Sequence, residues 1–128
     1  MKIFGDNDSK KDPTLITSWF LVHLLSGIIL MYIFYIYFNI DIWIATLIVL
    51  GLHTLYEIKD LFINPLFYPD TNIKKNHSIL NSIGDTIGCI IGILIVIFFI
   101  KNKNNTLFLS LVIVYFGLQV LFTNLNIN

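Results

Sequence analysis

The stretch SILNSIGDTIGCIIGILIVIFFI, residues 78–100, decides the fold of this chain. It is long enough to cross the hydrocarbon core of a membrane, which takes about 20 predominantly apolar residues in a helix. Asp85 is its one charged residue. A charge at such a depth costs about 2.5–3.5 kcal/mol on insertion scales, so it usually faces a partner or a water-filled cavity. The stretch therefore predicts a transmembrane helix with a polar contact.

Three further apolar stretches occur at residues 15–38, 40–61 and 106–122. Apolar residues make up 56% of the 128 residues and charged residues only 12%, whereas soluble domains carry roughly 25% charge. Short polar turns at residues 39–41 and 101–105 predict that consecutive spans run antiparallel. We therefore expect an all-α integral membrane bundle of four transmembrane helices in two antiparallel hairpins, with the lipid bilayer as partner.

The segments outside the spans are short. Residues 1–13 are polar and are expected to form a disordered cytoplasmic tail, which leaves residues 14–128 as a single four-span domain. The longer middle connection, residues 62–77, contains prolines and aromatic residues that suit the membrane interface. Asn76 or Ser78 is expected to cap the third span.

The distribution of lysine predicts the orientation. All cationic side chains are lysines and the formal net charge is zero, so the chain lacks the basic surface expected for nucleic-acid binding. With four spans, the two termini and the middle connection share one side of the membrane. That side carries Lys2, Lys10, Lys11, Lys59, Lys74 and Lys75, and the opposite side carries Lys101 and Lys103. Because cytoplasmic segments are enriched in lysine, we expect both termini in the cytoplasm.

Every span places a polar or ionisable residue at a similar depth. At about 1.5 Å of rise per residue, all of them fall within roughly 4–12 Å of the predicted cytoplasmic boundary. These candidate site residues are His23, His53, Glu57, Asn81, Asp85 and Gln119. Equal depth predicts one shared polar site, in which the histidines and carboxylates point inward and the two amides donate hydrogen bonds from outside.

The four inner residues suit several kinds of chemistry. His53 and Glu57 are four residues apart and share a helix face. Together with His23 and Asp85 they could ligate a divalent metal, because imidazole suits Zn or Fe and carboxylate suits Mg or Mn. The same groups suit a proton relay, or a hydrogen-bonded core that fixes helix register. His77, in the middle connection, is expected only to be solvated or to act as a cap.

A stripe of glycines runs along the third span at Gly84, Gly88 and Gly92. Small residues at this spacing let two helices approach closely. The partner helix belongs either to the same chain or to a second copy, which would make a homo-oligomer. The lone cysteine, Cys89, excludes an intrachain disulfide and a cysteine-based zinc site.

Glu57, followed after a loop by Asn81-Ser82-Ile83-Gly84-Asp85-Thr86-Ile87-Gly88, resembles the VanZ-like membrane family. That family shows a Glu late in one span, a polar loop, and an N-x-x-G-x-x-x-G pattern at the start of the next span. Glu57, Asn81, Gly84 and Gly88 fit this pattern, and the match covers about a quarter of the chain. The resemblance implies a small multi-pass membrane protein, of a kind linked in some members to glycopeptide-antibiotic resistance.

Three functions fit these residues. A structural polar core is the first expectation, since membrane bundles use polar contacts to fix helix packing. The second is a metal-assisted enzyme acting on a lipid headgroup, because the site lies at headgroup depth. The third is a transporter of protons or metal ions, which is disfavoured because the outer half of the spans lacks a continuous polar path. The substrate cannot be deduced from the sequence.

Overall fold

The computed structural model describes residues 1–5, 11–67 and 77–125. Four helices in this part of the chain are long and apolar enough to cross a membrane. They span Trp19–Tyr37, Ile42–Phe67, Ile79–Phe99 and Asn105–Asn124. The predicted all-α four-helix bundle is confirmed, and these helices support an integral membrane protein.

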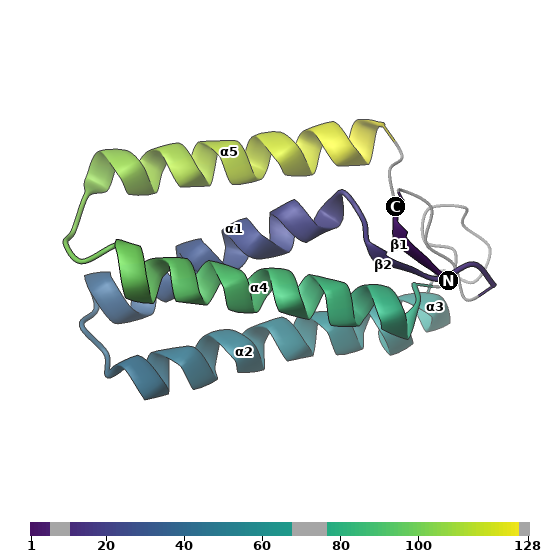
Figure 1. Ribbon diagram of the computed structural model, residues 1–128, viewed down its shortest axis with the longest axis horizontal. Coiled ribbons are helices and arrows are strands. Elements are labelled where there is room, and N and C mark those ends of the chain that lie inside the picture. Colours follow the sequence, from purple (N-terminus) through teal and green to yellow (C-terminus); the bar gives the residue numbers. More distant parts are fainter. Residues whose placement is uncertain (6–10, 68–76, 126–128) are drawn as a thin grey trace.

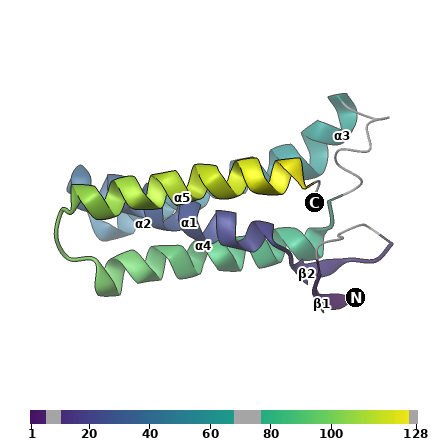
Figure 2. The ribbon, with the colours of Figure 1, turned by 90° about the horizontal axis from the view of Figure 1, so that it is seen from above.

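The bundle is arranged around its first helix. α1 (Trp19–Met31) continues as the π-helical segment η1 (Tyr32–Tyr37). The other long helices are α2 (Ile42–Ile58), α4 (Ile79–Phe99) and α5 (Asn105–Asn124). α1 lies between α4 and α5 in both views of the ribbon (Figure 1, Figure 2), and packs most extensively on α4. The start of α1 and the end of α5 lie at the same end of the bundle (Figure 1).

The second span is longer than predicted. After α2 the chain continues through the π-helical η2 (Lys59–Ile63) into α3 (Asn64–Phe67). Pro65 lacks a backbone N–H, so the regular α-helical pattern is interrupted before it, and a wider π-helical turn fills the gap. Part of the predicted middle connection is therefore helical.

Four of the features predicted from the sequence fall outside the described residues. They are Lys10, Lys74, Lys75 and the capping role of Asn76.

Polar side chains cap the helix starts where the sequence has its short turns. Asp41 accepts hydrogen bonds from the backbone N–H groups at the start of α2. Ser78 accepts one from Asn81 at the start of α4, so the predicted Ser78 cap is confirmed. Asn104 does the same for α5. Asn39, with φ of 54°, makes the left-handed turn before α2, a conformation that Asn tolerates better than most residues.

The N-terminal segment differs from the disordered tail expected of residues 1–13. β1 (Lys2–Phe4) pairs in parallel with β2 (Thr14–Ile16), with Lys2 opposite Thr14. The Lys2 ammonium also lies 2.5 Å from the Asp12 carboxylate. The sequence gives no sign of this pairing, because each strand is only three residues long, too short for the alternation of apolar and polar residues that predicts a strand.

The glycine stripe packs against the first span of the same chain. A Cβ on Gly84, Gly88 or Gly92 would lie 1.7, 2.9 or 2.2 Å from a backbone oxygen of the segment that leads into and through α1. A Cβ on Gly27 of α1 would lie 2.4 Å from the backbone oxygen of Cys89. Only glycine allows this approach, so the close packing predicted for the stripe is made within the chain.

Buried side chains divide the bundle into two halves. The half away from the termini is filled by apolar residues, among them Met31, Ala45, Val49 and Val96, all fully buried. The half near the termini holds the buried polar and charged residues. α5 is the most peripheral helix, and Phe122, in edge-to-face contact with Trp19, is its one buried residue.

We expect Gly92→Ala to lower the unfolding temperature in detergent, because its methyl group would meet the Leu24 backbone oxygen and force α1 and α4 apart. Overpacking of this kind costs about 1–3 kcal/mol. The matched control is Gly117→Ala in α5, where nothing lies within 4 Å of the new methyl group. Alanine there should be neutral or stabilising by about 0.5–1 kcal/mol. Equal unfolding temperatures for the two variants would contradict the packing role of the stripe.

Candidate functional site

Four ionisable side chains from three helices meet inside the polar half of the bundle. His23 comes from α1, His53 and Glu57 from α2, and Asp85 from α4. Their exposed fractions are 8%, 5%, 4% and 0% in that order. All four therefore face the interior, as equal depth in the sequence led us to expect.

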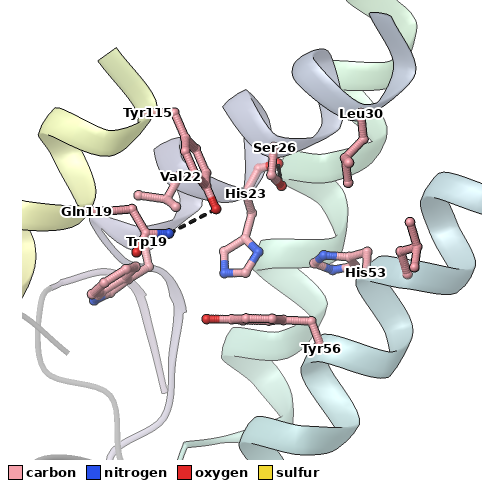
Figure 3. Close-up of a pocket in the computed structure, with 10 residues that line it drawn as sticks. Trp19, Val22, His23, Ser26, Leu30, His53, Tyr56, Tyr115 and Gln119 are labelled. Atoms are coloured by element: carbon pink, nitrogen blue, oxygen red, sulfur yellow. Dashed lines mark hydrogen bonds between the residues drawn. The ribbon is translucent and has the colours of Figure 1, made fainter. Parts of the chain in front are cut away.

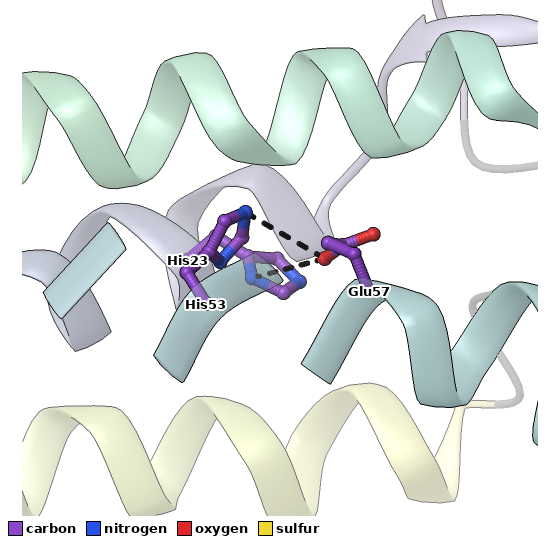
Figure 4. Close-up of side chains that lie close together, drawn as sticks. All are labelled: His23, His53 and Glu57. Atoms are coloured by element: carbon purple, nitrogen blue, oxygen red, sulfur yellow. Dashed lines mark ion pairs between the residues drawn. The ribbon is translucent and has the colours of Figure 1, made fainter. Parts of the chain in front are cut away.

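Glu57 approaches both histidines through one oxygen. Its Oε1 lies 3.8 Å from Nδ1 of His23 and 3.8 Å from Nε2 of His53. The two imidazole rings meet edge to face, with centroids 5.2 Å apart. Figure 4 shows the three side chains converging, with Glu57 reaching toward both rings. They therefore form one compact group.

Asp85 joins this group from α4 and brings in a third histidine. Its Oδ2 lies 3.5 Å from Nε2 of His23 and 3.7 Å from Nε2 of His77. Nε2 of His77 also lies 4.0 Å from Oε2 of Glu57. We name these five residues, His23, His53, Glu57, His77 and Asp85, the His/carboxylate cluster.

The prediction that His77 is only solvated or a cap is wrong. Its side chain is 22% exposed and sits over Asp85. The residue precedes the Ser78 cap, so the chain entering α4 carries the imidazole back over the first turns of the helix. Helix depth cannot place a residue that lies before a helix. The sequence feature that could have predicted its place is that the chain has only three histidines, and all three lie toward the same end of the predicted bundle.

Both carboxylates are buried without hydrogen bonds. All four side-chain oxygens of Glu57 and Asp85 are inaccessible and accept no hydrogen bond of normal length from the described residues, although Ser82 lies near Glu57 and His77 near Asp85. An unsatisfied buried polar group is costly, and an unpaired buried charge far more so. The cluster therefore holds two acceptor groups that point at imidazoles but are not satisfied by them.

The two amides predicted to donate to the cluster have other partners. Asn81 Nδ2 donates to the Thr17 hydroxyl at 3.3 Å. Gln119 Nε2 donates to the Tyr115 hydroxyl at 2.9 Å, within its own helix. Equal depth located both residues at the right height but said nothing about the direction in which each side chain points.

Thr86 is a contact of the cluster that the sequence analysis missed. Its hydroxyl donates to the backbone oxygen of Ser82 at 2.8 Å, so its lone pairs are left to accept from Nε2 of His53 at 3.1 Å. This fixes the ring of His53. A metal at Nε2 would replace the bond to Thr86, and the ring hydrogen would then have to lie on Nδ1.

The electrostatics of His77 differ from those of a free histidine. Burial acts to lower the pKa of His77, but the adjacent Asp85 carboxylate and then the charge of Glu57 more than offset this, so the pKa is raised. The raised pKa follows from the closeness of the His77 ring to both carboxylates.

A cavity of about 150 Å³ reaches the cluster from the side, between α1, α2 and α5. Figure 3 shows His23 and His53 at its inner wall, with Tyr56 below them and Tyr115 and Gln119 on α5 opposite. The remaining lining is mainly apolar. A small amphiphilic group could therefore approach two of the imidazoles from between the helices.

No protein-family model, curated protein or solved structure matches this chain. The fold and the site define it as a four-helix membrane protein with a buried cluster of histidines and carboxylates. Its function has to follow from the chemistry of that cluster.

Proposed function

We propose that the chain binds a divalent transition-metal ion inside the membrane, through His23, His53 and Glu57. These residues each offer a ligand atom, and the three atoms lie within 4.8 Å of one another. Two ligand atoms each about 2.0–2.2 Å from one ion can be at most about 4.4 Å apart, so the 3.8 Å approaches already suit a shared ion. Two histidines and one carboxylate are a ligand set typical of iron and zinc.

The observation that carries this proposal is the lack of hydrogen bonds on the buried carboxylates. A polar core that served only to fix helix register would satisfy its acceptors, since an unsatisfied buried group costs about 1–3 kcal/mol. Here all four oxygens of Glu57 and Asp85 are buried and unsatisfied. A divalent cation would use these oxygens as ligands and compensate their charge. This favours a metal site over a structural core.

The apolar packing of one half of the bundle argues against transport of protons or metal ions across the membrane. An ion crossing the membrane would have to pass the half that is filled by Met31, Val49, Val96 and their apolar neighbours. The buried charged groups of the described chain are confined to the other half. A site confined to one half of the bundle suits binding or catalysis better than passage across the membrane.

The test of metal binding is to strip the detergent-purified protein with chelator, load it with Zn²⁺ or Mn²⁺, remove the excess and measure bound metal. The intact chain should retain stoichiometric metal, and Glu57→Gln should lose at least about tenfold in affinity, because changing even a residue that only supports a metal ligand costs about 10–100-fold. Asp41→Asn is the matched control, because Asp41 is an acid outside the cluster and Asn also caps helices. It should bind as the intact chain does. An intact chain that retains no metal would rule the proposal out.

Thermal unfolding of Glu57→Gln separates the metal site from a structural ion pair. If the cluster holds metal, the variant should be as stable as the intact chain or more stable in chelator, because the repulsion between Glu57 and Asp85 is relieved. If Glu57 serves as a partner for a charged imidazole, its loss should destabilise the bundle by about 3–5 kcal/mol. A large destabilisation in chelator that added metal does not change would support the structural core.

A second function, catalysis on a lipid headgroup, is favoured by the lateral cavity. It is lined mainly by apolar side chains yet ends at His23 and His53. A metal held by three protein ligands keeps open positions, where it can polarise a carbonyl or phosphoryl oxygen or activate water. Membership of the VanZ-like family, carried by Glu57 and the Asn81–Gly88 pattern, is part of the same proposal.

To test catalysis, metal-loaded protein is incubated with vesicles of phosphatidylethanolamine and phosphatidylglycerol, and release of the headgroup is followed. Ser26→Trp, which fills the cavity beside His23, should reduce release by about 100-fold, while bound metal stays unchanged. The matched control is Ser110→Trp, because both serines bond only their own helix backbone but Ser110 is exposed. Intact lipids after incubation with fully metal-loaded protein would refute this second function.

The orientation with both termini in the cytoplasm is also a proposal, supported by the excess of lysine on that side. In a Cys89→Ala background, Lys11→Cys and Lys103→Cys should react with an impermeant thiol reagent from opposite sides of intact cells, with only Lys103→Cys labelled from outside. Labelling of Lys11→Cys from outside would reverse the orientation.

A further inference from the structure

A second set of three ligating side chains lies directly against the first. Glu57, His77 and Asp85 each offer a ligand atom, and these three atoms also lie within 4.8 Å of one another. Glu57 is the member common to both sets. The five residues of the cluster therefore form two triads that share one carboxylate.

The two oxygens of Glu57 face different triads. Oε1 is the oxygen near His23 and His53, at 3.8 Å from each ring nitrogen. Oε2 is the oxygen near His77, at 4.0 Å from its Nε2. Neither oxygen has a hydrogen-bond partner among the described residues. A carboxylate placed in this way can bind one ion with each oxygen.

We infer that the cluster is built for two divalent metal ions bridged by Glu57, with His23 and His53 on one ion and His77 and Asp85 on the other. Two-metal sites hold their ions about 3.5–4 Å apart, which a single bridging carboxylate can span. This inference rests on the proposed function, because it adds a second ion to the same site.

Asp85 links the two triads through His23. If Nδ1 of His23 faces the first ion, its Nε2 carries the hydrogen and points at Asp85 Oδ2, 3.5 Å away. Metal-bound histidines usually donate their other N–H to a carboxylate or carbonyl, which fixes the ring and raises its basicity. Asp85 would therefore orient a ligand of the first ion while it binds the second.

Each triad also has its own opening. The lateral cavity touches His23 and His53 but not His77. A separate cavity of about 350 Å³, bordered by Pro13, Leu61, Phe62 and Ile79, touches His77. These two cavities would give each ion its own access to water or a ligand, whereas a single ion needs only one.

The two ligand sets differ in character. The first has two imidazoles and one carboxylate, and the second has one imidazole and two carboxylates. Imidazole suits Zn or Fe and carboxylate suits Mn or Mg, so Mn²⁺ is the probe that both triads should accept. It also reports on bridging, because two Mn²⁺ ions joined by a carboxylate couple magnetically.

The experiment is to load the chelator-stripped full chain with Mn²⁺, measure bound manganese per chain and record its electron paramagnetic resonance spectrum. We expect two ions per chain and a spectrum of coupled ions. His53→Ala and His77→Ala should each reduce the stoichiometry from two to one and replace the coupled spectrum by that of an isolated ion. Asp41→Asn should retain two coupled ions. Circular dichroism verifies that each variant keeps its helices.

Each outcome distinguishes the proposed first metal site from the second metal site inferred here. One ion per chain that is lost in His53→Ala and retained in His77→Ala would overturn the second site and leave the proposed function standing. Two ions with an uncoupled spectrum, both retained in Glu57→Gln, would overturn the bridge. No retained manganese, with no retained zinc, would overturn both. His77→Asn serves as a second variant where His77→Ala fails to fold.

Discussion

The burial of two carboxylates beside one another is the constraint on which the rest of this structure depends. Glu57 and Asp85 are 4% and 0% exposed, in a bundle whose helices are apolar enough to lie in a membrane. Two negative charges in such surroundings repel strongly and are poorly solvated. Three imidazoles surround them, with ring nitrogens 3.5–4.0 Å from the carboxylate oxygens. The proposed metal ion would compensate the two charges.

The glycine stripe makes this arrangement sterically attainable. Helix axes packed through ordinary side chains are about 8–10 Å apart. At Gly92 and Gly27 the backbones of α1 and α4 approach so closely that a Cβ would fall 2.2–2.4 Å from a backbone oxygen of the other helix. That approach brings His23 within 3.5 Å of Asp85. The small residues thus act on the site indirectly, by setting the distance between the two helices that carry the ligands.

Sequence alone predicted the parts of this protein that depend on local chemistry. The spans follow from their apolar length, and the Ser78 cap follows from its position before a helix. Depth along a helix follows from a fixed rise per residue, and it predicts that His23, His53, Glu57 and Asp85 lie at one level. The direction in which a side chain points around the helix axis cannot be predicted from depth. Gln119 has the predicted depth but donates its hydrogen bond to Tyr115 and not to the cluster. His77 and the pairing of β1 with β2 depend on how the chain returns between helices, which depth cannot describe.

The helix that contributes least to the cluster has the clearest role in access to it. α5 supplies none of the five clustered residues and has a single buried residue, Phe122. Yet Tyr115 and Gln119 of α5 form the wall of the lateral cavity that faces His23 and His53. The proposed ligands lie on α1, α2 and α4 and in the segment just before α4, and α1 and α4 are held together by the glycine contacts, whereas the wall of the opening is formed in part by α5, which packs on α1. Small displacements of α5 would change access to the proposed site without moving a ligand, which is what the proposed activity on a lipid headgroup requires.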